Sequence, residues 1–269
     1  MRNSVEIHPT AIVAESAVLG AGCSVGAYSI IGPKVVMGAN NKVMAHVVIE
    51  GNTQIADGNT FFQFCSVGAA PQDLKFRGEE SLLKIGSGNI VREYVTLQPG
   101  TASGGMLTEI GNNNLFMASS HVGHDSKVGN NCWFANSVAL AGHVTVGSDV
   151  IVGGLSGIHQ FVHLGDHCMI GAGSMVAKDI LPYCNAQGDR AGLVGINKIG
   201  LQRRGFTVEE VQDIDRAYRS LFYGEGVFSD RLRQLRERST SDKILFLVNF
   251  AENSERGISF PRKKNNDQD

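Results

Sequence analysis

The sequence has little proline, little net charge and no paired cysteine motif. Six of its 269 residues are proline, and the formal net charge is −2. So small a net charge argues against nucleic acid as a partner. The five cysteines are an odd number without a C-x-x-C pair, so we expect free thiols in a reducing compartment. No apolar run is long enough to form a transmembrane segment, and the first residues lack the apolar core of a signal peptide. We therefore expect a cytoplasmic protein.

The chain is rich instead in glycine and in a six-residue repeat. Large apolar residues recur at every sixth position from Ile7 to Val67, from Ile85 to Leu97 and from Ile110 to Val176. A period of six fits neither an α-helix nor an alternating strand. It is typical of a parallel β-helix, in which each hexad forms a short strand and a turn. Glycine often follows the apolar residue, as at Gly20 and Gly129, and we expect positive φ angles there.

The repeat ends near residue 183, and helix signals replace it. We place a β-helix domain at residues 1–189 and a helical C-terminal domain at residues 190–269. A capping box at Thr207-Val208-Glu209-Glu210 begins the first of three expected helices. The other two are expected over residues 229–238 and 241–254.

Two insertions, at residues 69–83 and 98–109, interrupt the repeat, and most of the histidines follow them. Such insertions often form the binding face of a solenoid. Three hexads complete one triangular coil, so residues 18 apart are expected to stack. The patch predicted in this way comprises His124, Gly142, His143, His159 and Gln160. Asp125 adjoins His124 and could orient its imidazole and raise its basicity.

Two other interpretations of the histidines are possible. His159, His163 and His167 are spaced four apart, as in a zinc site on a helix. In a β-helix they fall at different points of the hexad, so one chain would not bring them together. Zinc held between subunits, as in β-helical carbonic anhydrases, is one alternative. A scaffold with solvated histidines is the other.

Several short segments then resemble a known family. They are IHPTAIV at 7–13, QDLK at 72–75, HVGHD at 121–125, LAGHV at 140–144, IHQF at 158–161 and LQRRGF at 201–206. In these the chain resembles the UDP-N-acetylglucosamine O-acyltransferases, which begin lipid A biosynthesis. The resemblance implies an all-β solenoid, a left-handed parallel β-helix of hexapeptide repeats with a C-terminal α-helical domain, assembled as a homotrimer. The closest alternative is the related UDP-3-O-acyl-glucosamine N-acyltransferase, which usually carries a globular domain before its β-helix.

The resemblance also implies a reaction and a catalytic centre. An (R)-3-hydroxyacyl group would pass from the phosphopantetheine of acyl carrier protein to the 3-hydroxyl of UDP-N-acetylglucosamine, with no further cofactor and no metal. His124 would be the general base, because a free sugar hydroxyl is a poor nucleophile. Asp125 would support His124. The backbone N–H of Gly142 would donate to the thioester oxygen as negative charge develops.

Further residues are assigned by the same resemblance. The substrate-contacting positions would be Asp73, Lys75, His121, His143, His159 and Gln160. The nucleotide would be held by Asn197, Arg203 and Arg204, since two guanidiniums suit a pyrophosphate. Ile199 stands where relatives commonly carry glutamate and cannot accept a hydrogen bond with its side chain. Ala172 and Arg190 occupy the positions expected to limit the acyl length.

Overall fold

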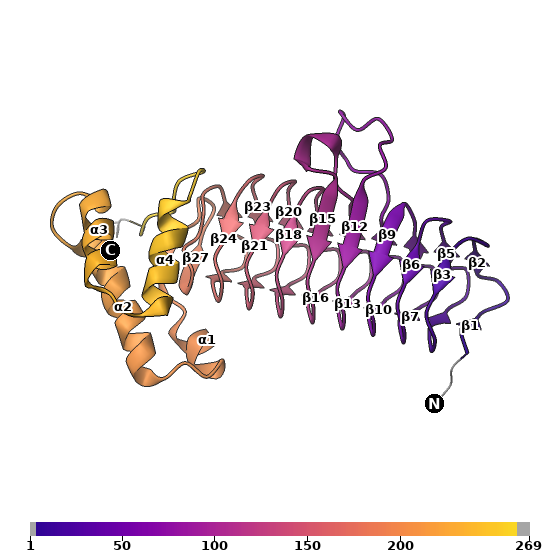
Figure 1. The fold of residues 1–269 in the computed structure, drawn as a ribbon, viewed down its shortest axis with the longest axis horizontal. Coiled ribbons are helices and arrows are strands. Elements are labelled where there is room, and N and C mark those ends of the chain that lie inside the picture. Colours follow the sequence, from indigo (N-terminus) through magenta and orange to yellow (C-terminus); the bar gives the residue numbers. More distant parts are fainter. Residues whose placement is uncertain (1–3, 263–269) are drawn as a thin grey trace, which may run out of the picture.

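The computed structural model describes residues 4–262 and contains a long triangular β-helix followed by a helical part (Figure 1). Sheet A comprises β1 (Glu6–Ile7), β4 (Ser24–Val25), β7 (Lys42–Val43), β10 (Thr60–Phe61), β13 (Ile90–Val91), β16 (Leu115–Phe116), β19 (Trp133–Phe134), β22 (Ile151–Val152), β25 (Met169–Ile170), β27 (Cys184–Gln187) and β28 (Gly192–Ile196). Sheet B comprises β2 (Ile12–Val13), β5 (Ile30–Ile31), β8 (Val48–Ile49), β11 (Ser66–Val67), β14 (Thr96–Leu97), β17 (His121–Val122), β20 (Ala139–Leu140), β23 (Gly157–Ile158) and β26 (Met175–Val176). Sheet C comprises β3 (Val18–Leu19), β6 (Val36–Met37), β9 (Asn52–Ile55), β12 (Leu82–Ile85), β15 (Leu107–Ile110), β18 (Lys127–Val128), β21 (Thr145–Val146) and β24 (His163–Leu164).

The six-residue repeat forms the core of this β-helix, and the predicted fold class is confirmed. The repeated apolar residues from Val25 to Val176 are buried inside the three sheets. Ile7, in the first coil of the described residues, is 49% exposed. Consecutive coils pair in parallel with an offset of 18 residues, as Ile12 with Ile30. All five cysteines are free, as expected. They are also buried, and burial raises the pKa of the Cys65 thiol to about 12.

The glycines that follow the apolar residues have a different cause from the one expected. Gly20 and Gly129 do not have positive φ angles. A Cβ on Gly20 would lie 2.5 Å from the carbonyl carbon of Gly38, so glycine lets adjacent coils approach closely. The left-handed conformation instead occurs three residues after the apolar position, for example at Asp125 (φ +60°) and His143 (φ +62°).

Both insertions leave the β-helix at the corner between sheets B and C. The first increases the coil offset to 30 residues, as between Asn52 and Leu82, and the second to 25, as between Leu82 and Leu107. A short 3-10 helix (Ala102–Gly104) lies in the second insertion. The two insertions project together beside β12 and β15 (Figure 1).

Beyond the last coil the chain forms a hairpin and then helices. β28 pairs with β27 in antiparallel orientation. This hairpin spans residue 189, which the sequence analysis gives as the last residue of the β-helix domain. The helices are α1 (Lys198–Arg203), α2 (Val208–Tyr223), α3 (Phe228–Arg238) and α4 (Asp242–Glu252). The capping box of α2 is confirmed, because Thr207 and Glu210 each accept the backbone N–H of the other.

The sequence analysis predicts neither α1 nor the hairpin. With six residues, α1 is too short for a helical period, and its N-cap Asn197 belongs to the nucleotide residues. Within residues 4–262, no helix has the length and apolar composition needed to cross a bilayer.

Candidate active site

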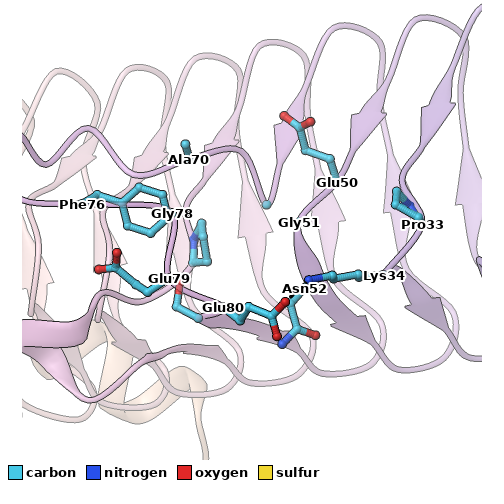
Figure 2. Close-up of a pocket in the computed structure, with 13 residues that line it drawn as sticks. Pro33, Lys34, Glu50, Gly51, Asn52, Ala70, Phe76, Gly78, Glu79 and Glu80 are labelled. Atoms are coloured by element: carbon cyan, nitrogen blue, oxygen red, sulfur yellow. Dashed lines mark hydrogen bonds and ion pairs between the residues drawn. The ribbon is translucent and has the colours of Figure 1, made fainter.

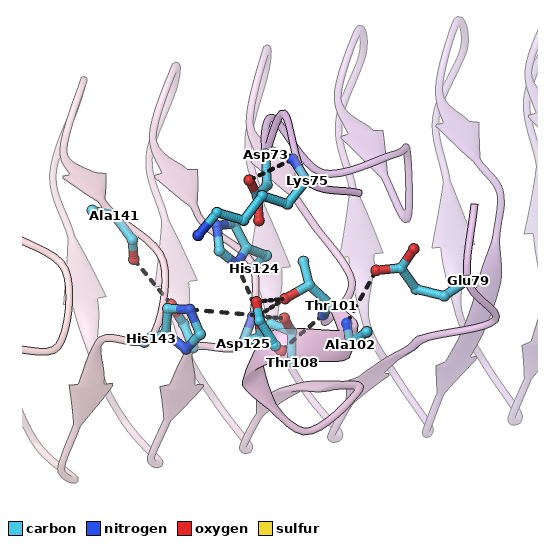
Figure 3. A network of polar contacts seen from close by, with 12 residues as sticks. Asp73, Lys75, Glu79, Thr101, Ala102, Thr108, His124, Asp125, Ala141 and His143 are labelled. Atoms are coloured by element: carbon cyan, nitrogen blue, oxygen red, sulfur yellow. Dashed lines mark hydrogen bonds and ion pairs between the residues drawn. The ribbon is translucent and has the colours of Figure 1, made fainter. Parts of the chain in front are cut away.

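His124 and Asp125 lie at the corner between sheets B and C, in the turn from β17 to β18. The Asp125 carboxylate is fully buried and lies 2.8 Å from Nδ1 of His124. It also accepts hydrogen bonds from the backbone N–H (2.8 Å) and the hydroxyl (2.6 Å) of Thr101 in the second insertion (Figure 3). Because the carboxylate can only accept, the proton of a neutral His124 ring lies on Nδ1. Nε2 then carries the lone pair that a general base requires.

Gly142 lies directly over the His124 ring, one coil further along. A Cβ at this glycine would be 2.6 Å from Nε2 and Cε1 of His124, so only glycine leaves room for the imidazole. The Gly142 N–H has no hydrogen-bond acceptor within residues 4–262. The stacking of residues 18 apart therefore brings Nε2 of His124, which can act as a base, close to the unpaired N–H of Gly142.

His143 adds a second imidazole to this corner. Its ring centre lies 5.1 Å from that of His124, edge to face, and it stacks on Phe161 at 4.5 Å. Burial lowers the pKa of His143, with the Asp125 charge opposing this effect. The ring is therefore neutral near pH 7 and can donate or accept a hydrogen bond.

The side chains of His124, Asp125 and His143 are also the possible metal ligands of this corner. Within the part of the chain that the structure describes, only His124, Asp125 and His143 form a trio whose donor atoms all lie within 4.8 Å of one another. His159, His163 and His167 form no such group, as the sequence interpretation anticipated. Both oxygens of Asp125 already accept hydrogen bonds from Thr101, which fixes the orientation of the carboxylate.

The first insertion carries Asp73 and Lys75 to this corner. Figure 3 shows both side chains projecting beside His124. The Lys75 N–H donates to the carboxylate of Asp73 at 2.9 Å, which fixes the loop between them. Leu74 at the tip is 96% exposed.

A hollow of about 440 Å³ lies under this insertion, with Lys34, Glu50, Phe76, Glu79 and Glu80 in its lining (Figure 2). Two of its carboxylates, those of Glu79 and Glu80, are engaged within the protein. Glu80 forms an ion pair with Lys34. Glu79 accepts the backbone N–H of Ala102 at 3.0 Å and thereby joins the two insertions next to Thr101. This contact stabilises the segment that holds Asp125.

His121 and His159 line an apolar hollow of about 320 Å³ on the outer face of sheet B. His121 shares a 2.7 Å hydrogen bond with the hydroxyl of Thr96, and burial lowers its pKa. Nδ1 of His159 lies 2.8 Å from the guanidinium of Arg256. Gln160 is exposed, does not line this hollow and has no side-chain polar contact among the described residues.

The three predicted nucleotide residues lie together at a different corner, between sheets C and A. Asn197, Arg203 and Arg204 line a hollow of about 920 Å³ that also contains Asp149 and Trp133. Arg204 donates to the Asp149 carboxylate at 2.9 Å. The Arg203 side chain has no polar partner within residues 4–262, so its guanidinium is available to a ligand. Within one chain this hollow and the His124 corner are therefore separate.

Asn197 and Ile199 complete the lining of this hollow at the start of α1. Asn197 accepts the N–H of Gly200 at 3.1 Å and donates to the carbonyl of His167 at 2.9 Å. Ile199 is 65% exposed and presents an apolar side chain to the hollow.

The two residues predicted to limit acyl length lie away from the sheet-B hollow. Ala172 is exposed after β25, and its backbone lies close to Gly153 of the preceding coil. Arg190 is exposed in the turn between β27 and β28. Neither residue contacts the hollow that contains His121 and His159 in the same chain.

Three residues that contact the predicted site were missed from the sequence: Thr101, Asp149 and Arg256. Thr101 lies in an insertion, where the stacking rule does not apply. Asp149 does obey the rule, but its partner Arg204 directly follows α1. Arg256 lies in the segment after α4, which packs back against the β-helix. No periodic pattern could have predicted its contact with His159.

Comparisons with known proteins agree with this architecture. Residues 143–178 match the bacterial transferase hexapeptide family, and residues 179–259 match the family model described as UDP N-acetylglucosamine O-acyltransferase, domain 2. The acyl-[acyl-carrier-protein]–UDP-N-acetylglucosamine O-acyltransferase of Sulfurovum sp. is 48% identical over 96% of this chain and 98% of its own length. That of Aliarcobacter butzleri is 46% identical over 96% of this chain and 99% of its own length.

A solved structure of a UDP-N-acetylglucosamine acyltransferase from Bacteroides fragilis is also similar to this chain. It has a TM-score of 0.90 and is 40% identical, covering 93% of this chain and 98% of its own. Identity at this level, over nearly the whole length of both chains, confirms the resemblance recognised in the short segments. The chain belongs to the UDP-N-acetylglucosamine O-acyltransferase family.

Proposed function

We propose that this protein transfers an (R)-3-hydroxyacyl group from acyl carrier protein to the 3-hydroxyl of UDP-N-acetylglucosamine, the first step of lipid A biosynthesis. One observation carries the proposal beyond family membership. His124 is oriented by a buried carboxylate 2.8 Å from Nδ1, while its other edge faces Gly142. A base and an unpaired backbone donor in adjacent coils are what attack on a thioester requires.

In this mechanism Nε2 of His124 removes the proton of the sugar hydroxyl as the oxygen attacks the thioester carbonyl. The carbonyl oxygen becomes negative and accepts the N–H of Gly142. Collapse of the intermediate breaks the carbon–sulfur bond, and the leaving thiolate takes the proton from His124. General-base catalysis contributes about 10²–10⁴-fold to such a rate, and one oxyanion donor about 10²–10³-fold. The thiol belongs to the phosphopantetheine of the carrier protein, so no further cofactor is needed.

We propose that the active form is a homotrimer with sites between subunits. The nucleotide residues and His124 lie at different corners of one chain, so a second copy can bring them together. The outer faces of sheets A and B support this, because they carry exposed apolar side chains such as Trp133, Met169 and Ile30. The outer face of sheet C carries charged residues such as Lys84 and Glu109 in its middle coils, and exposed Val18 and Val36 only in its first two strands. Exposed apolar faces mark association surfaces. A monomer with full activity would contradict the shared site.

From the nature of these substrates, we also propose that the reaction takes place in the cytoplasm. Incubating the protein with UDP-N-acetylglucosamine and 3-hydroxyacyl carrier protein should give a 3-O-acylated sugar nucleotide, detected by mass spectrometry. The same assay with the 3-amino sugar nucleotide and with donors of different length defines the acceptor and acyl preferences. Exclusive transfer to the 2-amine of UDP-3-O-acyl-glucosamine would instead identify the N-acyltransferase. No transfer to any of these acceptors would refute the proposal.

A further inference from the structure

The segment after α4 returns to the end of the β-helix and is fixed there by Asp179. This residue is 1% exposed. Its carboxylate accepts the N–H of His163 at 2.7 Å and the hydroxyl of Ser254 at 2.6 Å. Its backbone pairs with the same segment, since the Asp179 N–H donates to Gly257 and the carbonyl accepts from Ser259. The segment is therefore held in place beside the last coils.

This attachment brings Arg256 to the edge of the sheet-B hollow. Its Nε donates to the carbonyl of Ala177, which lines the hollow, at 2.9 Å. Its Nη2 lies 2.8 Å from Nδ1 of His159. The first of these contacts fixes the guanidinium of Arg256 beside the exposed His159 ring.

The two polar neighbours of Nδ1 make opposite demands on it. The guanidinium of Arg256 has only donors, so it requires a lone pair on Nδ1. The carbonyl of Gln160, 3.2 Å away, can only accept and would require a proton there. Nδ1 cannot satisfy both. The contact with Arg256 is shorter and involves a charged donor, which makes it the stronger one. The proton of the neutral ring therefore lies on Nε2.

We propose that Arg256 is a positioning residue that fixes the Nε2–H tautomer of His159. His159 then donates a hydrogen bond from Nε2 to a substrate oxygen in a hollow that is otherwise mostly apolar. The identity of that substrate rests on the proposed function, whereas the tautomer does not. With the opposite tautomer Nε2 could only accept, and a substrate carbonyl would meet a lone pair.

The tautomer can be measured directly in the full-length protein. We would label the histidines with ¹⁵N, record two-bond ¹H–¹⁵N spectra at alkaline pH, where the rings are neutral, and assign the His159 signal with His159→Gln. We expect a proton on Nε2 of His159 in the wild type and in Arg256→Lys, which keeps a charged donor. In Arg256→Met we expect the proton on Nδ1, donated to Gln160. Arg233→Met, the same substitution at an exposed ion pair on α3, should change nothing.

Kinetics give a second readout. Arg256→Met should raise KM about tenfold, the equivalent of roughly one hydrogen bond. The value of kcat should change less, because the His124–Asp125 pair is untouched. A proton on Nδ1 in the wild type would overturn the proposal even if Arg256→Met failed to fold. An unchanged tautomer in a folded Arg256→Met would overturn it as well. Failure of the wild type to acylate UDP-N-acetylglucosamine would refute the proposed function but not the tautomer assignment.

Discussion

Replacing Gly142 by alanine would put a methyl group where the imidazole of His124 lies. The new Cβ would be 2.6 Å from Nε2 and Cε1 of that ring, whereas carbon atoms in ordinary contact are about 3.5–4.0 Å apart. Gly142 does not have a positive φ, so alanine causes no backbone strain, and its N–H remains available as a donor. The crowding therefore acts on the position of the base.

The His124 side chain is the part that can yield, since it is 18% exposed. It must retreat by about 1 Å, and a misplacement of that size costs about 10²-fold in rate. We expect kcat/KM for acyl transfer to fall about 10²-fold, with a melting temperature close to that of the wild type. Steady-state transfer from 3-hydroxyacyl carrier protein and thermal unfolding of the same preparation measure the two quantities.

Gly32→Ala is the matched control for this variant. Its Cβ would also be crowded, at 3.1 Å from Cα of Glu50, but in coils that lie before both insertions. We expect a small loss of stability and an unchanged rate. If Gly142→Ala kept more than about a third of the wild-type kcat/KM, against the roughly 10²-fold loss expected for a displaced group, the position of the His124 ring would not limit the reaction.

Other predictions follow from the same geometry. His124→Ala should keep its fold by circular dichroism but lose about 10²–10⁴-fold in turnover, and a residual rate above a tenth would reject this base. Asp125→Ala should lose less turnover, yet it should unfold at a lower temperature because the buried N–H of Thr101 loses its acceptor. Arg203→Ala should weaken binding of UDP-N-acetylglucosamine in calorimetry, with a smaller loss at high salt; unchanged affinity would leave this residue without a role in the nucleotide site. Ala172→Met should shift donor preference to shorter acyl chains in a competition assay, because overpacking a fitted groove is unfavourable. An unchanged ranking would show that the groove ends elsewhere.

The proximity of His124 and Gly142 could be predicted because, in a solenoid, residues one coil apart in the sequence are neighbours in space. Each coil repeats the last, so a count of residues along the chain is a measure of distance in space. The same count placed His143 and His159 on consecutive coils. It gave the wrong cause for Gly20 and Gly129, because periodicity shows where glycine recurs but not that the next coil approaches within contact distance.

The sequence by itself determined the β-helix, the stacking of Gly142 on His124 and the capped helix α2, because each depends on a regular pattern of apolar or capping residues. Only the tertiary structure showed that Thr101 holds Asp125, that Asp149 holds Arg204 and that Arg256 contacts His159. These contacts join segments whose separation follows no period: an insertion, a helix and the returning C-terminal segment. These contacts depend on how the whole chain packs, so a local sequence pattern cannot predict them.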